Sequence, residues 1–225
     1  MNSTSIHVAI PGMSLGYALV GEQVVLVDAG ASSTQSAQDL LKKAGISPHS
    51  VSLIVLTHGH TDHLALLPQL QMLTNAPIMC HKKTAQCLAK GWGEEVVPRT
   101  PLFQILSRLT GSQKLKEPIS PHILVETPQD LRSFGVNAHV WPTPGHTPGS
   151  LSIITENKEA LVGDLLMKFP LQRHARASMI SHDVSLLQKS LGELQSQDLK
   201  SLYLSHGGKI PAHELDQAMI EIQSH

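Results

Sequence analysis

Short runs of aliphatic and β-branched residues alternate along the chain with longer stretches in which apolar residues recur every three or four positions. The first pattern predicts strands and the second predicts helices. In the N-terminal part, strands are predicted at 5–10, 17–20, 23–30, 51–57 and 76–80, and helices at 34–45, 63–73 and 82–90. The segment VSLIVLT, at 51–57, is nearly all apolar, so we expect a strand that is buried on both faces.

The same alternation returns in the second half of the chain. Strands are predicted at 122–126, 137–142, 150–156, 159–164 and 201–206, and helices at 184–195 and 213–222. Two strand-rich halves that each end in helices favour an α/β fold in which two sheets pack face to face with helices outside, a four-layer αββα sandwich. The 225 residues, of which 41% are hydrophobic, can build one core, and we expect a single domain over 1–225.

Residues 91–121 interrupt this alternation. They have the texture of an irregular insertion that holds one short apolar helix, LFQILSRL. Aromatic residues make up only 3% of the chain, yet Trp92 and Phe103 both lie in this segment. One interpretation is a lid, in which Phe103 and Leu106 contact a substrate. The alternative is that the segment only packs a small helix against the domain.

The charge balance narrows the range of partners. The formal net charge is −1, without the basic excess that binds phosphate backbones or anionic membrane surfaces. The N-terminal segment lacks the pattern of a secretory signal peptide, and no apolar run reaches the length of a membrane span. We therefore expect a cytoplasmic protein that binds a small molecule, with neither a nucleic acid nor a membrane as partner. A homodimer is left open.

One segment carries an unusual density of metal-binding side chains. The sequence HGHTDH, at 58–63, follows the apolar strand directly. His58 and His60 are two positions apart on an extended loop, so both can point the same way, and Gly59 between them takes no side-chain space. Asp62 and His63 then lie where the chain turns toward a helix. Imidazole and carboxylate together suit zinc best, with iron, manganese and cobalt as alternatives.

Further donors of the same kind lie at the ends of other predicted strands. His146 lies in the turn TPGHTPGS, Asp164 in LVGDLL and His206 in YLSHGG. Functional residues are often carried on loops that a rigid scaffold positions. One loop cannot complete two metal coordination shells, so we expect these three side chains to join the HGHTDH loop.

Taken in order, these motifs resemble the metallo-β-lactamase superfamily. Its HxHxDH signature stands as HGHTDH, Asp28 lies in LVDAG, and His146, Asp164 and His206 follow. The resemblance extends from the first strand to about residue 210. It implies the αββα fold of that family and a metal-dependent hydrolase.

The resemblance also implies a cofactor of two zinc ions, with iron or manganese as alternatives, and a role for each ligand. The first ion would be held by His58, His60 and His146 and the second by Asp62, His63 and His206, with Asp164 bridging the two. Asp28 would orient the ligand loop from behind. A hydroxide shared by the two ions would attack the substrate, and Asp62 would also orient the hydroxide or transfer a proton.

The substrate is less constrained than the metal site. Because Asp164 stands where the secreted antibiotic-resistance enzymes have Cys, the chain resembles the hydroxyacylglutathione hydrolase, lactonase and phosphodiesterase branches more closely. Met167 stands where the lactonases have Tyr, which weakens the lactonase reading, and a short thioesterase stays open. Lys168 and His174 are candidate substrate contacts, although an isolated lysine is more typical of a solvated surface and a single histidine is more typical of a structural position.

We therefore expect a hydrolase of a small ester, thioester or lactone. A phosphodiesterase or nuclease would use the same ligands but needs a basic groove, and a β-lactam hydrolase is a further alternative. A flavodiiron reductase is disfavoured, because such an enzyme would have a carboxylate at the position of His60 and a flavin domain. A non-catalytic metal-binding module is the remaining possibility, which the complete ligand set disfavours.

Overall fold

A computed structural model describes residues 3–31, 34–99 and 113–223. Its first sheet has the order β1-β2-β3-β4-β5-β6. Its strands are β1 (Ser5–Ile10), β2 (Gly16–Val20), β3 (Val24–Val27), β4 (Val51–Val55), β5 (Ile78–His81) and β6 (Ile123–Val125). The first three strands are antiparallel neighbours, and β3 to β6 are parallel.

The second sheet has the order β14-β13-β10-β9-β8-β7. Its strands are β7 (Gln129–Asp130), β8 (Ala138–Pro142), β9 (Leu151–Thr155), β10 (Glu159–Gly163), β13 (Ser201–Leu204) and β14 (Gly208–Pro211). Only β10 and β13 pair in parallel; the other neighbours are antiparallel. A separate small ribbon joins β11 (Leu166–Met167) to β12 (Arg176–Ala177).

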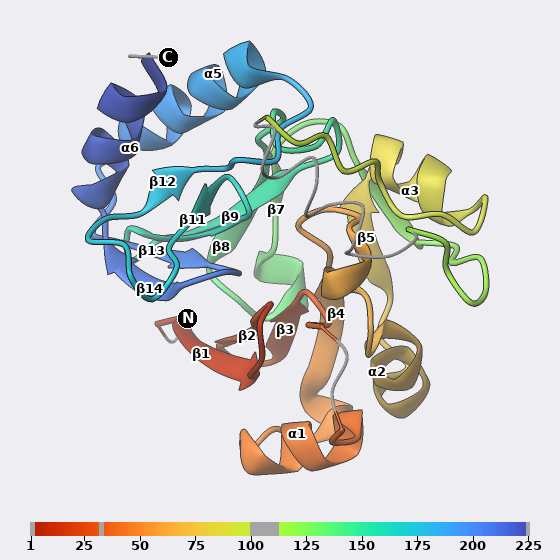
Figure 1. The fold of residues 1–225 in the computed structure, drawn as a ribbon. Coiled ribbons are helices and arrows are strands. Elements are labelled where there is room, and N and C mark those ends of the chain that lie inside the picture. The colour runs from red at the N-terminus through yellow and green to blue at the C-terminus, as the bar shows by residue number, and fades with distance from the viewer. Residues whose placement is uncertain (1–2, 32–33, 100–112, 224–225) are drawn as a thin grey trace.

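Helices cover the outer faces of the two sheets. They are α1 (Ala37–Lys43), α2 (Leu67–Thr74), α3 (Lys82–Leu88), α5 (Val184–Gln195) and α6 (Glu214–Gln223). Figure 1 shows α5 and α6, in blue, on one side of the molecule and α1 and α2 on the opposite side, with the strands between them. Short 3-10 turns lie at Pro48–Ser50, Thr61–His63 and Arg132–Phe134. No helix in the described part of the chain is long and apolar enough to cross a membrane.

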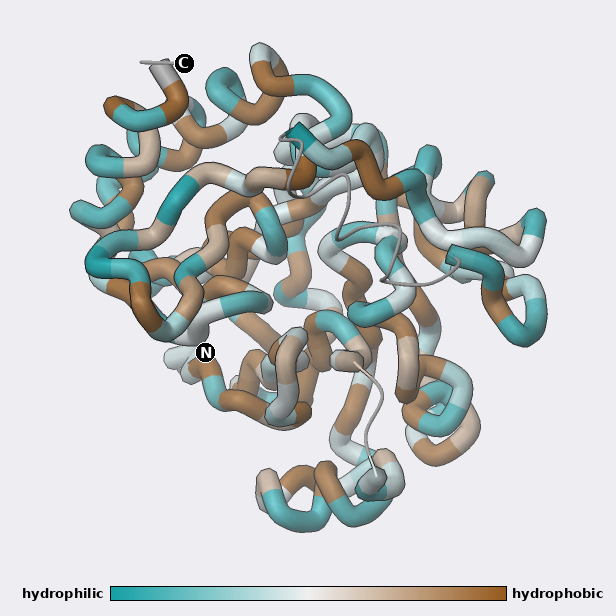
Figure 2. Tube along the Cα trace, viewed as in Figure 1, coloured by the Kyte–Doolittle hydropathy of each residue, from teal (hydrophilic) through white to brown (hydrophobic). Residues whose placement is uncertain are grey.

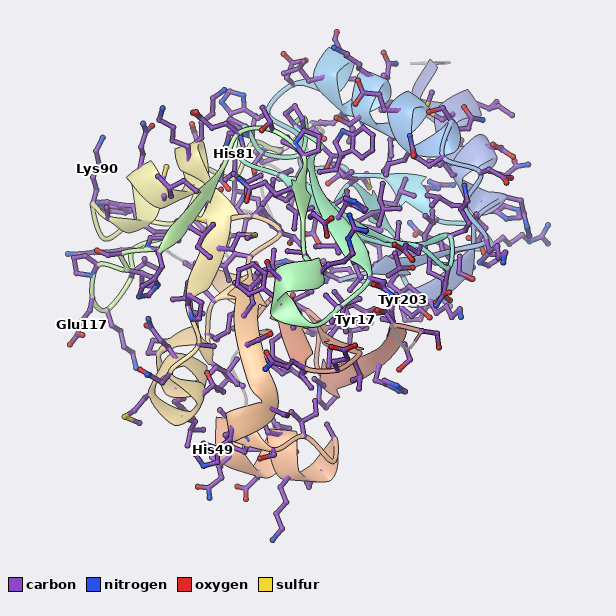
Figure 3. All side chains as sticks on the ribbon, turned by 180° about the vertical axis from the view of Figure 1, so that it is seen from behind. Tyr17, His49, His81, Lys90, Glu117 and Tyr203 are labelled. Carbon is purple, nitrogen blue, oxygen red and sulfur yellow. The ribbon has the colours of Figure 1, made fainter. Side chains whose placement is uncertain are left out.

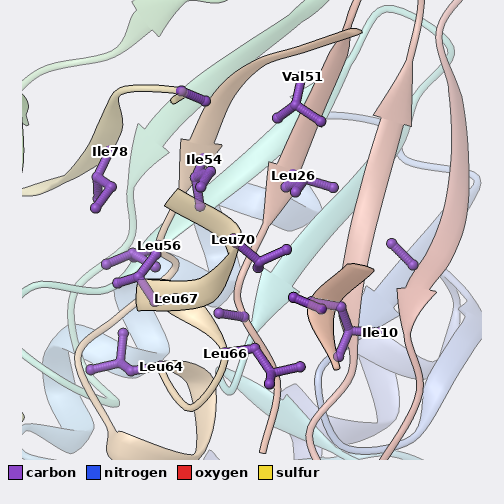
Figure 4. Packing of buried hydrophobic residues seen from close by; sticks show 14 of the residues in the cluster. Ile10, Leu26, Val51, Ile54, Leu56, Leu64, Leu66, Leu67, Leu70 and Ile78 are labelled. Atoms are coloured by element: carbon purple, nitrogen blue, oxygen red, sulfur yellow. The ribbon is translucent and has the colours of Figure 1, made fainter. Parts of the chain in front are cut away.

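Three apolar clusters separate the layers. Leu26 and Ile54 point from the first sheet toward α1 and α2, whereas Val25 and Leu53, one position earlier, point toward the second sheet. Figure 4 shows the first of these clusters, with Leu67 and Leu70 of α2 packed against β4. The third cluster packs the far face of the second sheet against α5 and α6. The four-layer αββα prediction is confirmed, and β4 is buried on both faces as expected.

The two sheets also meet through a pair of tyrosines. Tyr17 of β2 and Tyr203 of β13 lie side by side (Figure 3), with ring centroids 5.6 Å apart in an edge-to-face arrangement. The Tyr17 hydroxyl donates a hydrogen bond of 2.6 Å to the carbonyl of Leu204. Figure 2 shows the same layering by hydropathy, with apolar residues gathered in the strands and polar residues on the outer turns of the helices.

Element boundaries differ from the sequence prediction in two ways. The helix expected over 63–73 begins only at Leu67, because Thr61–His63 forms a 3-10 turn and Pro68 occupies the first turn of α2. The short strands β7, β11, β12 and β14 were missed, since runs of two to four residues carry too little alternation to be recognised. Within 91–121, the described residues form no helix and no strand, but only two isolated bridges, one between Trp92 and Lys114 and one between Pro98 and Ile180.

Candidate metal centre

The HGHTDH loop leaves the end of β4 at the edge between the two sheets. His58, His60 and His63 are buried there, with relative exposures of 1%, 4% and 0%. The chain stays extended through His60 and then tightens into the 3-10 turn Thr61–His63. This change of conformation brings His63 back toward the first two imidazoles, with its ring centroid 4.1 Å from that of His58.

The other predicted ligands come from the second sheet. His146 lies in the loop from β8 to β9, Asp164 directly follows β10, and His206 follows β13. His146 and Asp164 are buried, and His206 is only partly exposed. The structure therefore brings together all seven side chains that the sequence singled out as ligands, from both sheets, as two groups whose donor atoms lie within 4.8 Å of one another.

The first group is built around three imidazoles. The Nδ1 atom of His60 lies 3.1 Å from Nε2 of His58 and 3.1 Å from Nε2 of His146. Asp164 Oδ2 lies 4.0 Å from His58 Nε2 and 3.8 Å from His146 Nε2. Zinc–nitrogen bonds of about 2.0 to 2.1 Å in a tetrahedron place neighbouring nitrogens roughly 3.3 Å apart, so the two distances from His60 are close to the spacing that a shared ion requires.

The second group consists of Asp62, His63 and His206. His206 Nε2 lies 3.3 Å from Asp62 Oδ2 and 3.3 Å from Asp164 Oδ2. His63 Nε2 lies 3.7 Å from Asp62 Oδ2 and 3.5 Å from Asp164 Oδ1. Asp164 thus faces both groups. Its Oδ1 atom is buried and has no hydrogen-bond partner, and a buried anionic oxygen without a donor fits a cation.

The far side of each imidazole is held by the protein. His58 Nδ1 contacts the Thr57 hydroxyl. In each of the other four rings, one nitrogen lies beside an oxygen that accepts a hydrogen bond. These pairs are His60 Nε2 with Glu95 O, His63 Nδ1 with Asp28 Oδ2, His146 Nδ1 with Ile180 O and His206 Nδ1 with Met13 O. Because these four acceptors cannot donate, the anchored ring nitrogen carries the proton. The nitrogen that faces the cluster is then free to bind a metal.

Asp28 lies at the centre of this support. Its carboxylate accepts hydrogen bonds from the Thr57 amide at 2.7 Å, from the Thr57 hydroxyl at 2.7 Å and from His63 Nδ1 at 2.9 Å. The residue has a positive φ of 61°, a conformation that Asp tolerates better than most residues. That backbone conformation ends β3 and turns the carboxylate toward the ligand loop.

The electrostatics of the cluster fit a cation in the place of protons. Burial, together with the neighbouring imidazoles, lowers the pKa of His58 far below its usual value and that of His146 to about 3. Burial also opposes the charged form of His206, but the carboxylates of Asp164 and Asp62 outweigh it and raise the pKa to about 10. The pKa of His63 is raised in the same way by Asp164 and Asp28. A metal ion that binds here displaces protons from the second group.

Lys168 and His174, which the sequence offered as substrate contacts, do not belong to the ligand clusters. The Lys168 ammonium lies 2.7 Å from Glu214 Oε1, so its charge is balanced by a buried carboxylate. His174 is exposed on the loop before β12. Phe103 and Leu106 lie outside the described residues. Sequence reasoning missed Glu94, a buried carboxylate that contacts both ligand loops, because a lone Glu in an irregular segment carries no motif.

Comparison with known proteins agrees with this geometry. The sequence model of the metallo-beta-lactamase superfamily matches residues 10–206. The "Probable metallo-hydrolase MJ0888" of Methanocaldococcus jannaschii is 30% identical over 199 residues, covering 86% of this chain and 87% of that protein. The "Probable metallo-hydrolase YflN" of Bacillus subtilis is 25% identical over 205 residues, covering 81% of this chain and 75% of its own length.

Solved structures share the fold at low sequence identity. ST1585 from Sulfolobus tokodaii, an archaeal metallo-beta-lactamase superfamily protein, superposes with a TM-score of 0.72 at 19% identity, covering 98% of this chain and 86% of that one. The BLEG-1 B3 metallo-beta-lactamase gives 0.67 at 22% identity, covering 93% and 95%. The family model and the relatives match most of the chain, and histidine and aspartate clusters lie where a metal would bind. This chain therefore belongs to the metallo-β-lactamase superfamily and is a metal-dependent hydrolase.

Proposed function

We propose that the protein is a binuclear zinc hydrolase of small esters, thioesters or lactones. The observation that carries the proposal is the position of Asp164 between the two ligand groups, with one buried oxygen that no donor satisfies. Two zinc ions bound by these residues would supply hydroxide at neutral pH by lowering the pKa of a shared water to about 7. Iron or manganese would suit the same donors.

Asp62 is the member of the cluster that faces solvent. Its side chain is 46% exposed, whereas that of His63 beside it is fully buried. Burial alone would raise the pKa of Asp62, but the hydrogen bond from His206 outweighs this and leaves the pKa below its usual value. Asp62 is therefore ionised at neutral pH and can accept a proton at the open edge of the centre. This position supports a role in orienting the attacking hydroxide or passing a proton to the leaving group.

The surroundings of this open edge support an uncharged acyl substrate. Met13, whose carbonyl accepts a hydrogen bond from His206, has an 85% exposed side chain. The nearby Lys168 is already paired with Glu214. Among the described residues that contact His206, an exposed apolar side chain and a lysine that is already paired suit an ester, thioester or lactone better than a phosphodiester, whose negative charge calls for cationic contacts.

The test combines metal analysis with a substrate panel. After reconstitution with zinc, we expect close to two ions per chain and hydrolysis of a thioester, lactone or simple ester probe. The panel also includes nitrocefin and a phosphodiester. One ion or none per chain would overturn the binuclear assignment. Turnover of only the phosphodiester, or only of nitrocefin, would replace the proposed substrate class.

A further inference from the structure

A third buried carboxylate lies behind the metal ligands. Glu94 follows α3 in the segment that interrupts the alternation of strands and helices, and it is only 3% exposed. Its Oε2 atom accepts hydrogen bonds from the Gly59 amide at 2.7 Å and from the Thr84 and Thr147 hydroxyls at 3.0 Å each. Its Oε1 atom accepts from the Gly149 amide at 3.0 Å. Both oxygens are thus satisfied by donors from three separate segments.

Two of these segments are the loops that carry the first group of ligands. Gly59 lies between His58 and His60, and Thr147 directly follows His146. The two loops extend from different sheets, one after β4 and the other after β8. One carboxylate therefore joins the two loops whose imidazoles meet at His60 Nδ1, which lies 3.1 Å from Nε2 of His58 and 3.1 Å from Nε2 of His146.

The backbone beside Glu94 strengthens this connection. The Glu94 amide donates a 2.9 Å hydrogen bond to the Gly59 carbonyl, in return for the bond that Gly59 donates to the carboxylate. The next carbonyl, of Glu95, lies 3.2 Å from His60 Nε2 and fixes that ring. Residues 94 and 95 thus hold both the backbone and one imidazole of the HGH loop.

The glycines of the two loops are explained by the same contacts. A Cβ atom on Gly149 would lie 2.1 Å from the Thr84 hydroxyl and 2.8 Å from Glu94 Oε1. A Cβ atom on Gly59 would lie 3.0 Å from Thr84 and 3.1 Å from Glu94 Cγ. Metal coordination does not by itself require glycine at these positions, whereas the close approach of Glu94 and Thr84 does.

We propose that Glu94 is a positioning residue of the metal centre, which joins the two ligand loops and holds His58, His60 and His146 in the geometry of one metal site. The proposal rests on metal binding at this cluster, as the proposed function does, but not on any substrate. Residues that support metal ligands from behind typically change metal affinity or activity by about 10- to 100-fold when they are mutated.

The test compares Glu94→Gln with Glu214→Gln. Both residues are buried glutamates that accept hydrogen bonds, but Glu214 binds Lys168 and Ala175 rather than a ligand loop. Zinc affinity is measured by competition with a chelator, the site geometry by the visible spectrum of the cobalt(II)-loaded protein, and stability by the melting temperature of the metal-free protein. In Glu94→Gln, an NH2 group replaces one carboxylate oxygen. This group can only donate, yet the four protein groups around it are themselves hydrogen-bond donors. We therefore expect zinc affinity to fall about 10-fold or more and the cobalt spectrum to change.

Glu214→Gln should lower the melting temperature while leaving zinc affinity and the cobalt spectrum as in the wild type. If Glu94→Gln does not fold, Thr147→Val removes one of the bonds to Glu94, with the remote buried Thr155→Val as its control. Wild-type zinc affinity and an unchanged cobalt spectrum in the Glu94 or Thr147 variant would overturn the positioning role. Wild-type protein that binds zinc without hydrolysing any probe would contradict the proposed function alone, and wild-type protein that binds no metal would overturn both.

Discussion

At the scale of single residues, Asp164 is a buried carboxylate that lies between the two groups of candidate ligands. It directly follows β10 at Gly163, whose positive φ of 54° turns the chain at the end of the strand. Its two oxygens lie 3.5 Å from His63 and 3.3 Å from His206, and one of them lacks a hydrogen bond. Burial alone raises the pKa of this carboxyl, yet the surrounding imidazoles, His206 first, outweigh that and hold it well below its usual value. The ionised form is therefore built into the site.

Replacing Asp164 by Asn should weaken metal binding and hydrolysis strongly. An amide offers one neutral oxygen in place of two charged ones. We therefore expect metal affinity and kcat/KM to fall by at least the 10- to 100-fold that is typical when a residue supporting a metal ligand is mutated. The matched control is Asp183→Asn. Asp183 caps α5 by accepting a 2.9 Å hydrogen bond from the Leu186 amide, and Asn caps helices about equally well. Metal content and kcat/KM measure both variants, and equal effects would contradict the bridging assignment.

At the scale of elements, the His146 loop is held by the N-cap residue of α5 and the residue before it. The Asp183 amide donates to the Gly145 carbonyl and the His182 amide donates to the His146 carbonyl, each at 3.0 Å. Gly145 has a φ of 143°, and a Cβ there would lie 2.3 Å from the backbone of Leu187. The position of one metal ligand therefore depends on the packing of a helix from the outer layer.

Gly145→Ala should consequently lower both stability and metal affinity. The new methyl group meets helix backbone, which cannot rotate aside, so the loop or the helix must shift at a cost of about 2 to 4 kcal/mol in the free energy of unfolding. Gly192→Ala is the control. Gly192 lies inside α5, and a Cβ added there would meet no other part of the protein within 4 Å. This substitution should stabilise the helix by about 0.5 to 1 kcal/mol. Denaturant unfolding measures the stability of both variants, and a chelator competition measures their metal affinity. A Gly145 variant as stable as the wild type would contradict the packing argument.

At the scale of the whole molecule, the candidate metal centre draws its residues from both sheets. His58, His60, Asp62 and His63 follow a strand of the first sheet, and His146, Asp164 and His206 follow strands of the second. An apolar cluster also lies between the sheets, and it consists mostly of aliphatic residues with the Tyr17 and Tyr203 pair. Bound metal should therefore contribute to the stability of the entire fold.

Removal of the metal by a chelator should lower the melting temperature. A ligand at a thousand times its dissociation constant stabilises a protein by about 4 kcal/mol, which for a domain of this size corresponds to roughly 10 °C. Calorimetry before and after chelation, with metal content determined on the same samples, measures the effect. The Asp164→Asn variant should show a smaller shift. A melting temperature that stays constant after demonstrated metal loss would mean that the fold does not depend on the centre.

The candidate ligand residues could be predicted from the sequence because their signals are local. The HGHTDH loop is contiguous, and His146, Asp164 and His206 each lie in or at the start of a loop that follows a recognisable strand. The layers were predictable for a similar reason, since the alternation of apolar residues in a strand is set by its backbone period of two residues. Sheets with an apolar face must then be covered.

The contacts around those ligands were decided only by the tertiary structure. Glu94 bonds to Gly59 and Gly149, which are 35 and 55 positions away, and Lys168 pairs with Glu214, 46 positions away. No periodicity or short motif links such residues, because their meeting depends on the path of the whole chain. The sequence by itself thus determined which side chains can bind metal and in which layers the chain packs. The folded structure determined which buried carboxylate holds the ligand loops together and which cation is already neutralised, since hydrogen bonds and ion pairs form between whatever groups the packing brings within about 3 Å.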